Sequence, residues 1–117
     1  MKTILVVEDD KAIASALKIR LTAAGYDIHV AHDAVTAGIV ARRCNPEIAL
    51  LDIGMPGGSG FDVAERLQGL CGKVAIIFLT ANSRAELRVK AQTMGADAFF
   101  EKPFSSSQLI DTIESLA

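Results

Sequence analysis

Five polar residues of this chain stand where apolar segments end: Glu8, Asp9, Asp52, Thr80 and Lys102. Carboxylates in a group suit a hard cation such as Mg²⁺, which typically takes one or two carboxylates, water and a phosphate oxygen. An ionised carboxylate can attack phosphorus to form an acyl phosphate. The charge on the transferred group must then be neutralised, which a cation, an amine and a hydroxyl can do. These residue types therefore indicate metal-dependent phosphoryl transfer to an aspartate, provided that the fold brings them together.

Asp52 ends the segment on which the rest of the chain depends. The apolar residues 48–51 precede it, and the turn-forming stretch 54–60, rich in glycine, follows it. A short apolar run bounded by turn residues is typical of a buried strand, so Asp52 should lie where the backbone leaves the sheet. An aspartate at this point is also a common loop initiator, and the position alone does not establish a function.

Strands and helices are expected to alternate along the whole chain. Apolar or alternating segments predict strands at residues 3–7, 26–31, 48–52, 74–79 and 98–101. The 26–31 segment alternates polar and apolar residues, which favours an edge position. Helices are predicted at residues 11–24, 34–43, 61–70, 83–94 and 105–116. The expected fold class is therefore α/β, a five-stranded parallel sheet with helices on both faces.

Several helix starts carry recognisable capping residues. Asp10 and Asp33 are suitable N-caps for the first two helices. Ser83 with Glu86, and Ser105 with Gln108, have the spacing of a capping box.

The carboxyl ends of parallel strands lie at one edge of a sheet, where ligands bind. In the flavodoxin-like strand order 2-1-3-4-5, Glu8, Asp9 and Asp52 would face one another, with Thr80 and Lys102 beside them. Two carboxylates about 4 Å apart repel by roughly 4 kcal/mol at an effective dielectric near 20. A bound cation would offset that cost.

This arrangement leads to a specific hypothesis for the site. Asp9 and Asp52 bind Mg²⁺ directly, Glu8 acts through water, and the backbone carbonyl of Gly54 is a further ligand. Asp52 is expected to be ionised at pH 7 from its ordinary pKa, so that no general base is needed. Lys102 and the Thr80 hydroxyl would each take one oxygen of the transferred group.

These motifs resemble the receiver domain of two-component response regulators, the CheY-like fold. The resemblance rests on residues 6–10 (VVEDD), 51–56 (LDIGMP), 79–81 (LTA) and 102–104 (KPF), and it covers residues 1–117 as one domain. It implies that Asp52 accepts a phosphoryl group from a sensor histidine kinase or a histidine phosphotransfer protein. The protein would then be a switch that catalyses only its own phosphoryl transfer and autodephosphorylation.

The resemblance also implies how the signal spreads. Thr80 would move toward the phosphoryl group and Phe99 would turn inward, which changes the surface of the fourth helix, fifth strand and fifth helix for a downstream protein target. A cis peptide before Pro103 is expected on the same grounds. Phe99 lacks the hydroxyl of a tyrosine. Gln108 and Thr112 stand where dimers of the winged-helix branch pair an acid and an arginine, which weakens the case for that form of phosphorylation-dependent dimer.

Composition agrees with an ordinary globular domain. The 117 residues carry a net charge of −2, which offers no basic patch for direct nucleic-acid binding. The longest apolar run, residues 74–79, is far below the roughly 18 residues of a membrane span. Residues 1–3 lead straight into a strand, which is unlike a signal peptide. Cys44 and Cys71 are too few for a metal knuckle and are expected to be reduced, in the cytoplasm.

Other interpretations of the same residues remain open. The acids at residues 8–10 also suit the start of a helix, and Lys102 could extend into solvent. A haloacid-dehalogenase-type phosphatase would need a second aspartate where Gly54 stands. A flavin module would place the flavin phosphate against residues 8–10, which would repel it. A receiver-like interaction scaffold, and a module excised from a larger regulator or hybrid kinase, are the further alternatives.

Overall fold

The computed structural model describes residues 1–55 and 59–116. Five parallel strands form one sheet in the order β2-β1-β3-β4-β5, as predicted. The strands are β1 (Thr3–Val7), β2 (Asp27–Ala31), β3 (Ile48–Asp52), β4 (Ala75–Thr80) and β5 (Ala98–Glu101). The turn expected over residues 56–58 lies outside the described residues.

The three inner strands are almost entirely buried because helices cover both of their faces. Their residues are apolar except at one end of each strand, where Thr3, Asp52 and Thr80 stand. β2 lies at one edge of the sheet, which confirms the prediction made from its alternating residues. β1 pairs with β3 in the register Val7 to Leu51. The residues after Val7 and the last residue of β3 therefore emerge side by side.

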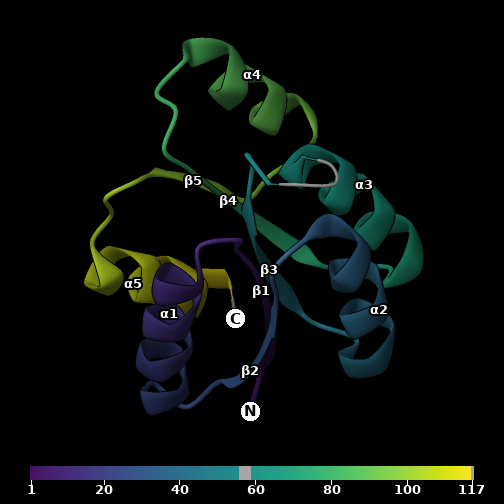
Figure 1. Ribbon diagram of the computed structural model, residues 1–117, viewed down its shortest axis with the longest axis vertical. Helices are drawn as coiled ribbons and strands as arrows, with labels where there is room; N and C mark the ends of the chain where they lie inside the picture. The colour runs from purple at the N-terminus through teal and green to yellow at the C-terminus, as the bar shows by residue number, and fades with distance from the viewer. Residues whose placement is uncertain (56–58, 117) are drawn as a thin grey trace.

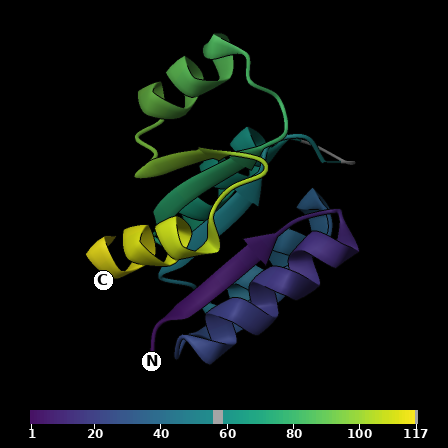
Figure 2. The same cartoon turned by 90° about the vertical axis from the view of Figure 1, so that its left-hand side faces the viewer.

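The helices form a layer on each side of the sheet. They are α1 (Lys11–Ala23), α2 (Ala34–Cys44), α3 (Gly60–Leu70), α4 (Ala85–Thr93) and α5 (Ser106–Leu116). One apolar core joins the sheet to α1 and α5, which lie next to each other in Figures 1 and 2. The other core joins the opposite face to α2, α3 and α4. The predicted helices on both faces are thus confirmed.

Side-chain caps begin four of the helices. Asp10 accepts hydrogen bonds from the N–H groups of Ala12 and Ile13, and Asp33 accepts one from Thr36, as predicted. Ser59 and Asp62 form a capping box at the start of α3. The hydroxyl of Ser105 accepts a bond from the N–H of Gln108, which supplies half of the capping box expected at α5.

The capping box predicted from Ser83 and Glu86 is wrong. α4 begins at Ala85, and no side chain caps it. The side-chain oxygen of Asn82 accepts the N–H of Arg84 at 3.0 Å, and the carboxylate of Glu86 pairs with the Arg84 side chain. This local turn moves the start of the helix beyond the reach of Ser83.

Gly60 holds the start of α3 close to the end of β3. A Cβ atom at this position would lie 2.5 Å from the backbone oxygen of Asp52, so only glycine fits. The N–H of Gly60 donates to the carbonyl of Ile53 at 3.0 Å.

Among the described helices, none is long and apolar enough to cross a membrane.

Candidate functional site at the carboxyl edge of the sheet

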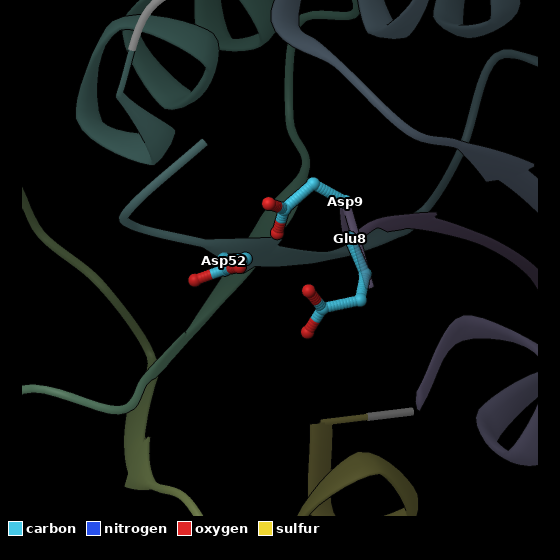
Figure 3. A group of neighbouring side chains, drawn as sticks. All are labelled: Glu8, Asp9 and Asp52. Atoms are coloured by element: carbon cyan, nitrogen blue, oxygen red, sulfur yellow. The ribbon is translucent and has the colours of Figure 1, made fainter. Parts of the chain in front are cut away.

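Three carboxylates from two neighbouring strands meet at the carboxyl edge. Glu8 and Asp9 follow β1, and Asp52 ends β3. One carboxylate oxygen of each lies within 4.8 Å of the others, and Figure 3 shows the three side chains gathered at this edge of the sheet. An all-oxygen donor set at this spacing suits a hard divalent cation. The predicted meeting of these three residues is therefore found.

Lys102 reaches this cluster from the loop after β5. Its Nζ lies 2.5 Å from Oε1 of Glu8 and 3.4 Å from Oδ2 of Asp52. The other oxygen of Glu8 accepts the N–H of Asp10 at 3.1 Å. Glu8 is completely buried, so the ammonium group is its counter-ion. The sequence predicts that Lys102 donates to an oxygen of the transferred phosphoryl group. In the structure, which holds no phosphoryl group, Lys102 pairs with Glu8.

The cluster lines one wall of an open pocket of about 360 Å³. Thr80, which is buried at the end of β4, also lines the pocket. The Thr80 hydroxyl oxygen accepts the N–H of Asn82 at 2.9 Å, which leaves its proton free to donate into the pocket. Gly54 also lines the pocket, and its N–H donates to Asp52 at 3.2 Å. The role predicted for its carbonyl oxygen stays a prediction.

The electrostatics of the pocket change one expectation. Burial raises the pKa of Asp52 from 3.8 to about 7, and hydrogen bonding with Glu8 and Asp9 adds to the effect. Asp52 is therefore only partly ionised at pH 7 in the cation-free pocket, and the expectation of a fully ionised nucleophile is wrong for that state. The hydrogen bond with Asp52 lowers the pKa of Asp9. Burial alone would lower the pKa of Lys102, but the bond to Glu8 and the nearby carboxylates raise it.

Phe99 lies outside the pocket, on β5. Its ring is half-buried, and the guanidinium of Arg88 lies 4.6 Å from its centroid. Arg88 also pairs with Glu101 at 3.6 Å. Sequence spacing gives no sign of a contact between Arg88 and a strand residue 11 positions later. The contact could be found only once α4 and β5 were placed against each other.

One further expectation, concerning a peptide bond, can be compared with the structure, and one residue without a predicted role contacts the site. The peptide bond between Lys102 and Pro103 is cis, as the resemblance implied. His32, to which the sequence gave no role, places Nδ1 3.0 Å from the backbone carbonyl of Glu8. His32 therefore contacts the backbone of the acidic pair and is not among the residues that line the pocket.

Comparison of the sequence with known protein families identifies the family of this chain. The family model described as the response regulator receiver domain matches residues 4–114. The chain belongs to this family. Response regulator MprA of Mycobacterium tuberculosis is 34% identical to the receiver domain described here over 113 residues, which cover 97% of this chain and 49% of that protein. The chain thus spans about half the length of the curated relatives that it matches.

Solved receiver structures agree with this assignment. A CheY-like receiver domain protein from Methanospirillum hungatei has a TM-score of 0.90 at 31% identity, covering 99% of this chain and 94% of that one. A response regulator from Burkholderia pseudomallei, crystallised with a phosphorylated aspartic acid, a calcium ion and citrate, has a TM-score of 0.87 at 25% identity. That match covers 98% of this chain and 71% of the other. The receiver domain is a signalling switch of two-component systems.

Proposed function

We propose that Asp52 is the phosphoacceptor of this receiver domain and that a histidine kinase or a histidine phosphotransfer protein is the donor. The observation that carries the proposal is the meeting of Asp52 with Asp9, Glu8 and Lys102 in one open pocket. An oxygen of Asp52 forms a bond to phosphorus while the bond from phosphorus to the donor's imidazole nitrogen breaks, and that nitrogen keeps the electron pair. The phosphorylated aspartic acid of the Burkholderia relative supports the same chemistry here.

The neighbouring side chains would stabilise the transferred group. Lys102 is 3.4 Å from Asp52 and can donate to a phosphoryl oxygen when it turns from Glu8. The free proton of Thr80 can donate to a second oxygen. The end of β4 and the loop after β5 hold these two residues beside Asp52, so movements of their side chains alone suffice to reach the phosphoryl group.

The donor set of the pocket fits Mg²⁺, which the family typically binds. We propose Asp9 and Asp52 as direct ligands, the Gly54 carbonyl as a third and Glu8 as an indirect contact. When bound, Mg²⁺ would neutralise negative charge on the carboxylates and the phosphoryl group. Because Glu8 already accepts from Lys102 and Asp10, it is the acid least free to bind a cation directly.

A protein donor has a suitable surface next to the pocket. A largely apolar groove of about 560 Å³ between α1 and the loop after β5 shares Ile13, Ala81 and Lys102 with the acidic pocket. A donor helix resting in this groove would place its phosphohistidine over Asp52. Transfer then changes the surface of α4, β5 and α5, which we propose as the region read by a downstream protein in the cytoplasm.

Acetyl phosphate offers a direct test of the proposed function. With Mg²⁺ present, intact mass should show one added phosphoryl group on the wild type and none on Asp52→Asn. Asp111→Asn, a change at an exposed aspartate of α5, is the matched control and should behave like the wild type. Equal labelling of the wild type and Asp52→Asn would refute the assignment and favour an unphosphorylated scaffold.

Magnesium affinity should depend on Asp9. Asp9→Asn removes one of the two charged ligands and should weaken Mg²⁺ binding by about tenfold or more in isothermal titration. Because cation binding favours ionised Asp52, whose pKa is about 7 without a cation, the wild-type affinity should rise from pH 6 to pH 8. Equal affinities for the two proteins would contradict the ligand assignment.

Arg88 should hold Phe99 in its outer position. A cation–π contact of this kind contributes about 0.5–1 kcal/mol, so Arg88→Ala should increase the inward population of Phe99 by roughly two- to fivefold. The NMR signals of the Phe99 ring report this population. Lys90→Ala is a matched control, because Lys90 lies in α4 like Arg88 but contacts a different ring, that of Phe61 in α3, at 4.6 Å from its centroid. An equal response in both variants would rule out a specific role for Arg88.

A further inference from the structure

The outer face of α2 and α3 exposes apolar side chains that the fold does not use. Val35 is 63% exposed, Ile39 is 50% exposed and Leu70 is 41% exposed. All three line one groove of about 290 Å³ between the two helices, which lie next to each other on the right of Figure 1. Scattered apolar residues are ordinary on protein surfaces, but a contiguous group at a groove is typical of an interface.

Charges of both signs border the same groove. Arg42 and Arg66 line it, and Glu65 lines an adjoining hollow that shares Arg66 and Leu70. The ion pairs found among residues 1–55 and 59–116 do not include Arg42, Glu65 or Arg66. Arg66 makes one hydrogen bond, to the carbonyl of Ala34 at 3.4 Å. Most donors of both guanidinium groups are therefore available to a partner's carboxylates.

This combination fits a second copy of the chain better than a partner of one charge. A two-fold interface uses the same patch on both copies, so the patch must complement itself. A face that carries apolar residues, carboxylates and guanidinium groups together can meet that condition, whereas a purely acidic partner would place like charge against Asp62 and Glu65. Gly69 lies on the same exposed side of α3, and a Cβ atom there would meet nothing within 4 Å. A second helix can approach closely at this point.

We propose that two copies of this chain associate through the α2–α3 face, defined by Val35, Ile39, Arg42, Glu65, Arg66 and Leu70. The apolar residues pack across the two-fold axis, and Glu65 pairs with the partner's Arg42. The face lies across the sheet from α1 and α5 and does not include the acidic pocket. Association therefore requires no phosphoryl group or Mg²⁺. With only three apolar side chains at its centre, the dimer should be weak, with a Kd on the order of 100 μM.

Sedimentation of the unphosphorylated protein in EDTA, from about 10 μM to about 1 mM, tests this proposal. The wild type should change from monomer to dimer over that range. Ile39→Lys should weaken association by about tenfold or more, because it places a charge at the apolar centre. Ile19→Lys on α1 and Val89→Lys on α4 are matched controls, since both residues are at least 60% exposed on other helices. They should leave association unchanged, and circular dichroism confirms that each variant folds.

Charge reversal identifies the pairing across the axis. Arg42→Glu and Glu65→Arg should each weaken the dimer, and the double variant should recover most of the lost association because the pair is restored with reversed polarity. A wild type that is monomeric at about 1 mM overturns the proposal. So does association that Val89→Lys disrupts and Ile39→Lys does not, because the contact would then lie on another face.

Discussion

Replacing Lys102 with methionine is expected to lower the free energy of unfolding by about 3–5 kcal/mol at neutral pH, the usual cost of removing one partner from a buried ion pair. Glu8 is completely buried and relies on Lys102 for its counter-charge. Without the ammonium group, the Glu8 carboxylate keeps one hydrogen bond within residues 1–55 and 59–116, from the N–H of Asp10, and it still faces the other carboxyl groups of the pocket. The variant should also lose most of its phosphoryl transfer, because one donor to the phosphoryl oxygens is gone.

Urea unfolding as a function of pH measures the first effect. The native pKa of Lys102 is raised above 10.5, so its contribution to stability is fully present below pH 10.5 and is lost as the pH rises through the native pKa. The difference between wild type and variant should therefore be present at neutral pH and shrink at strongly alkaline pH, where Lys102 loses its charge. Lys18→Met, at an exposed lysine of α1, should change stability by less than about 0.5 kcal/mol. An equally small effect for Lys102→Met would mean that the buried pair is not formed.

Replacing Asp52 with asparagine should have the opposite effect on stability and abolish phosphorylation. The native pKa of about 7 lies well above 3.8, so folding favours the protonated carboxyl group. Ionisation costs nothing below about pH 4, costs more as the pH rises toward 7, and reaches its full cost above pH 7. A shift of this size corresponds to at most about 4 kcal/mol. Because asparagine must also be desolvated, we expect a gain of roughly 2 kcal/mol at pH 8.

Unfolding in EDTA at pH 4, 6 and 8 tests the sign of this effect. The advantage of Asp52→Asn over the wild type should be absent at pH 4 and grow with pH. Saturating Mg²⁺ should reduce it at pH 8, because the cation stabilises ionised Asp52 in the wild type. Asp111→Asn should show no such pH dependence. A variant less stable than the wild type at pH 8 would contradict the raised pKa.

The strands of this fold could be predicted to within one residue because their apolar runs end at turn residues. Helix ends depended on caps, and they were predicted well where a side chain accepts the backbone N–H groups, as at Asp10 and Asp33. The prediction failed at Ser83, where Asn82 forms a competing turn. Capping-box spacing shows only that the two side chains could hydrogen-bond to the backbone at a helix start. A neighbouring side chain can form a competing hydrogen bond with the same stretch of backbone.

The membership of the site could also be predicted, since strand order alone brings residues 9, 52, 80 and 102 to one edge. The ion pairs and pKa values within the site could not be predicted from the sequence. The engagement of Lys102 by Glu8 depends on side-chain reach, and the pKa of Asp52 depends on burial that only packing reveals. The contact of Arg88 with Phe99 depends on how α4 lies on β5. Each of these features arises from side chains of separate elements that meet only in the folded protein.

The central claim concerns which atom receives the phosphoryl group, and reductive mapping tests it most directly. Wild-type protein treated with acetyl phosphate and Mg²⁺ is reduced with borohydride, which converts an aspartyl phosphate to homoserine, and its peptides are sequenced by mass spectrometry. We predict homoserine at position 52 and at no other aspartate, with none formed when Mg²⁺ is chelated. Homoserine at Asp9 instead, or a protein that yields none with Mg²⁺ present, would contradict the account.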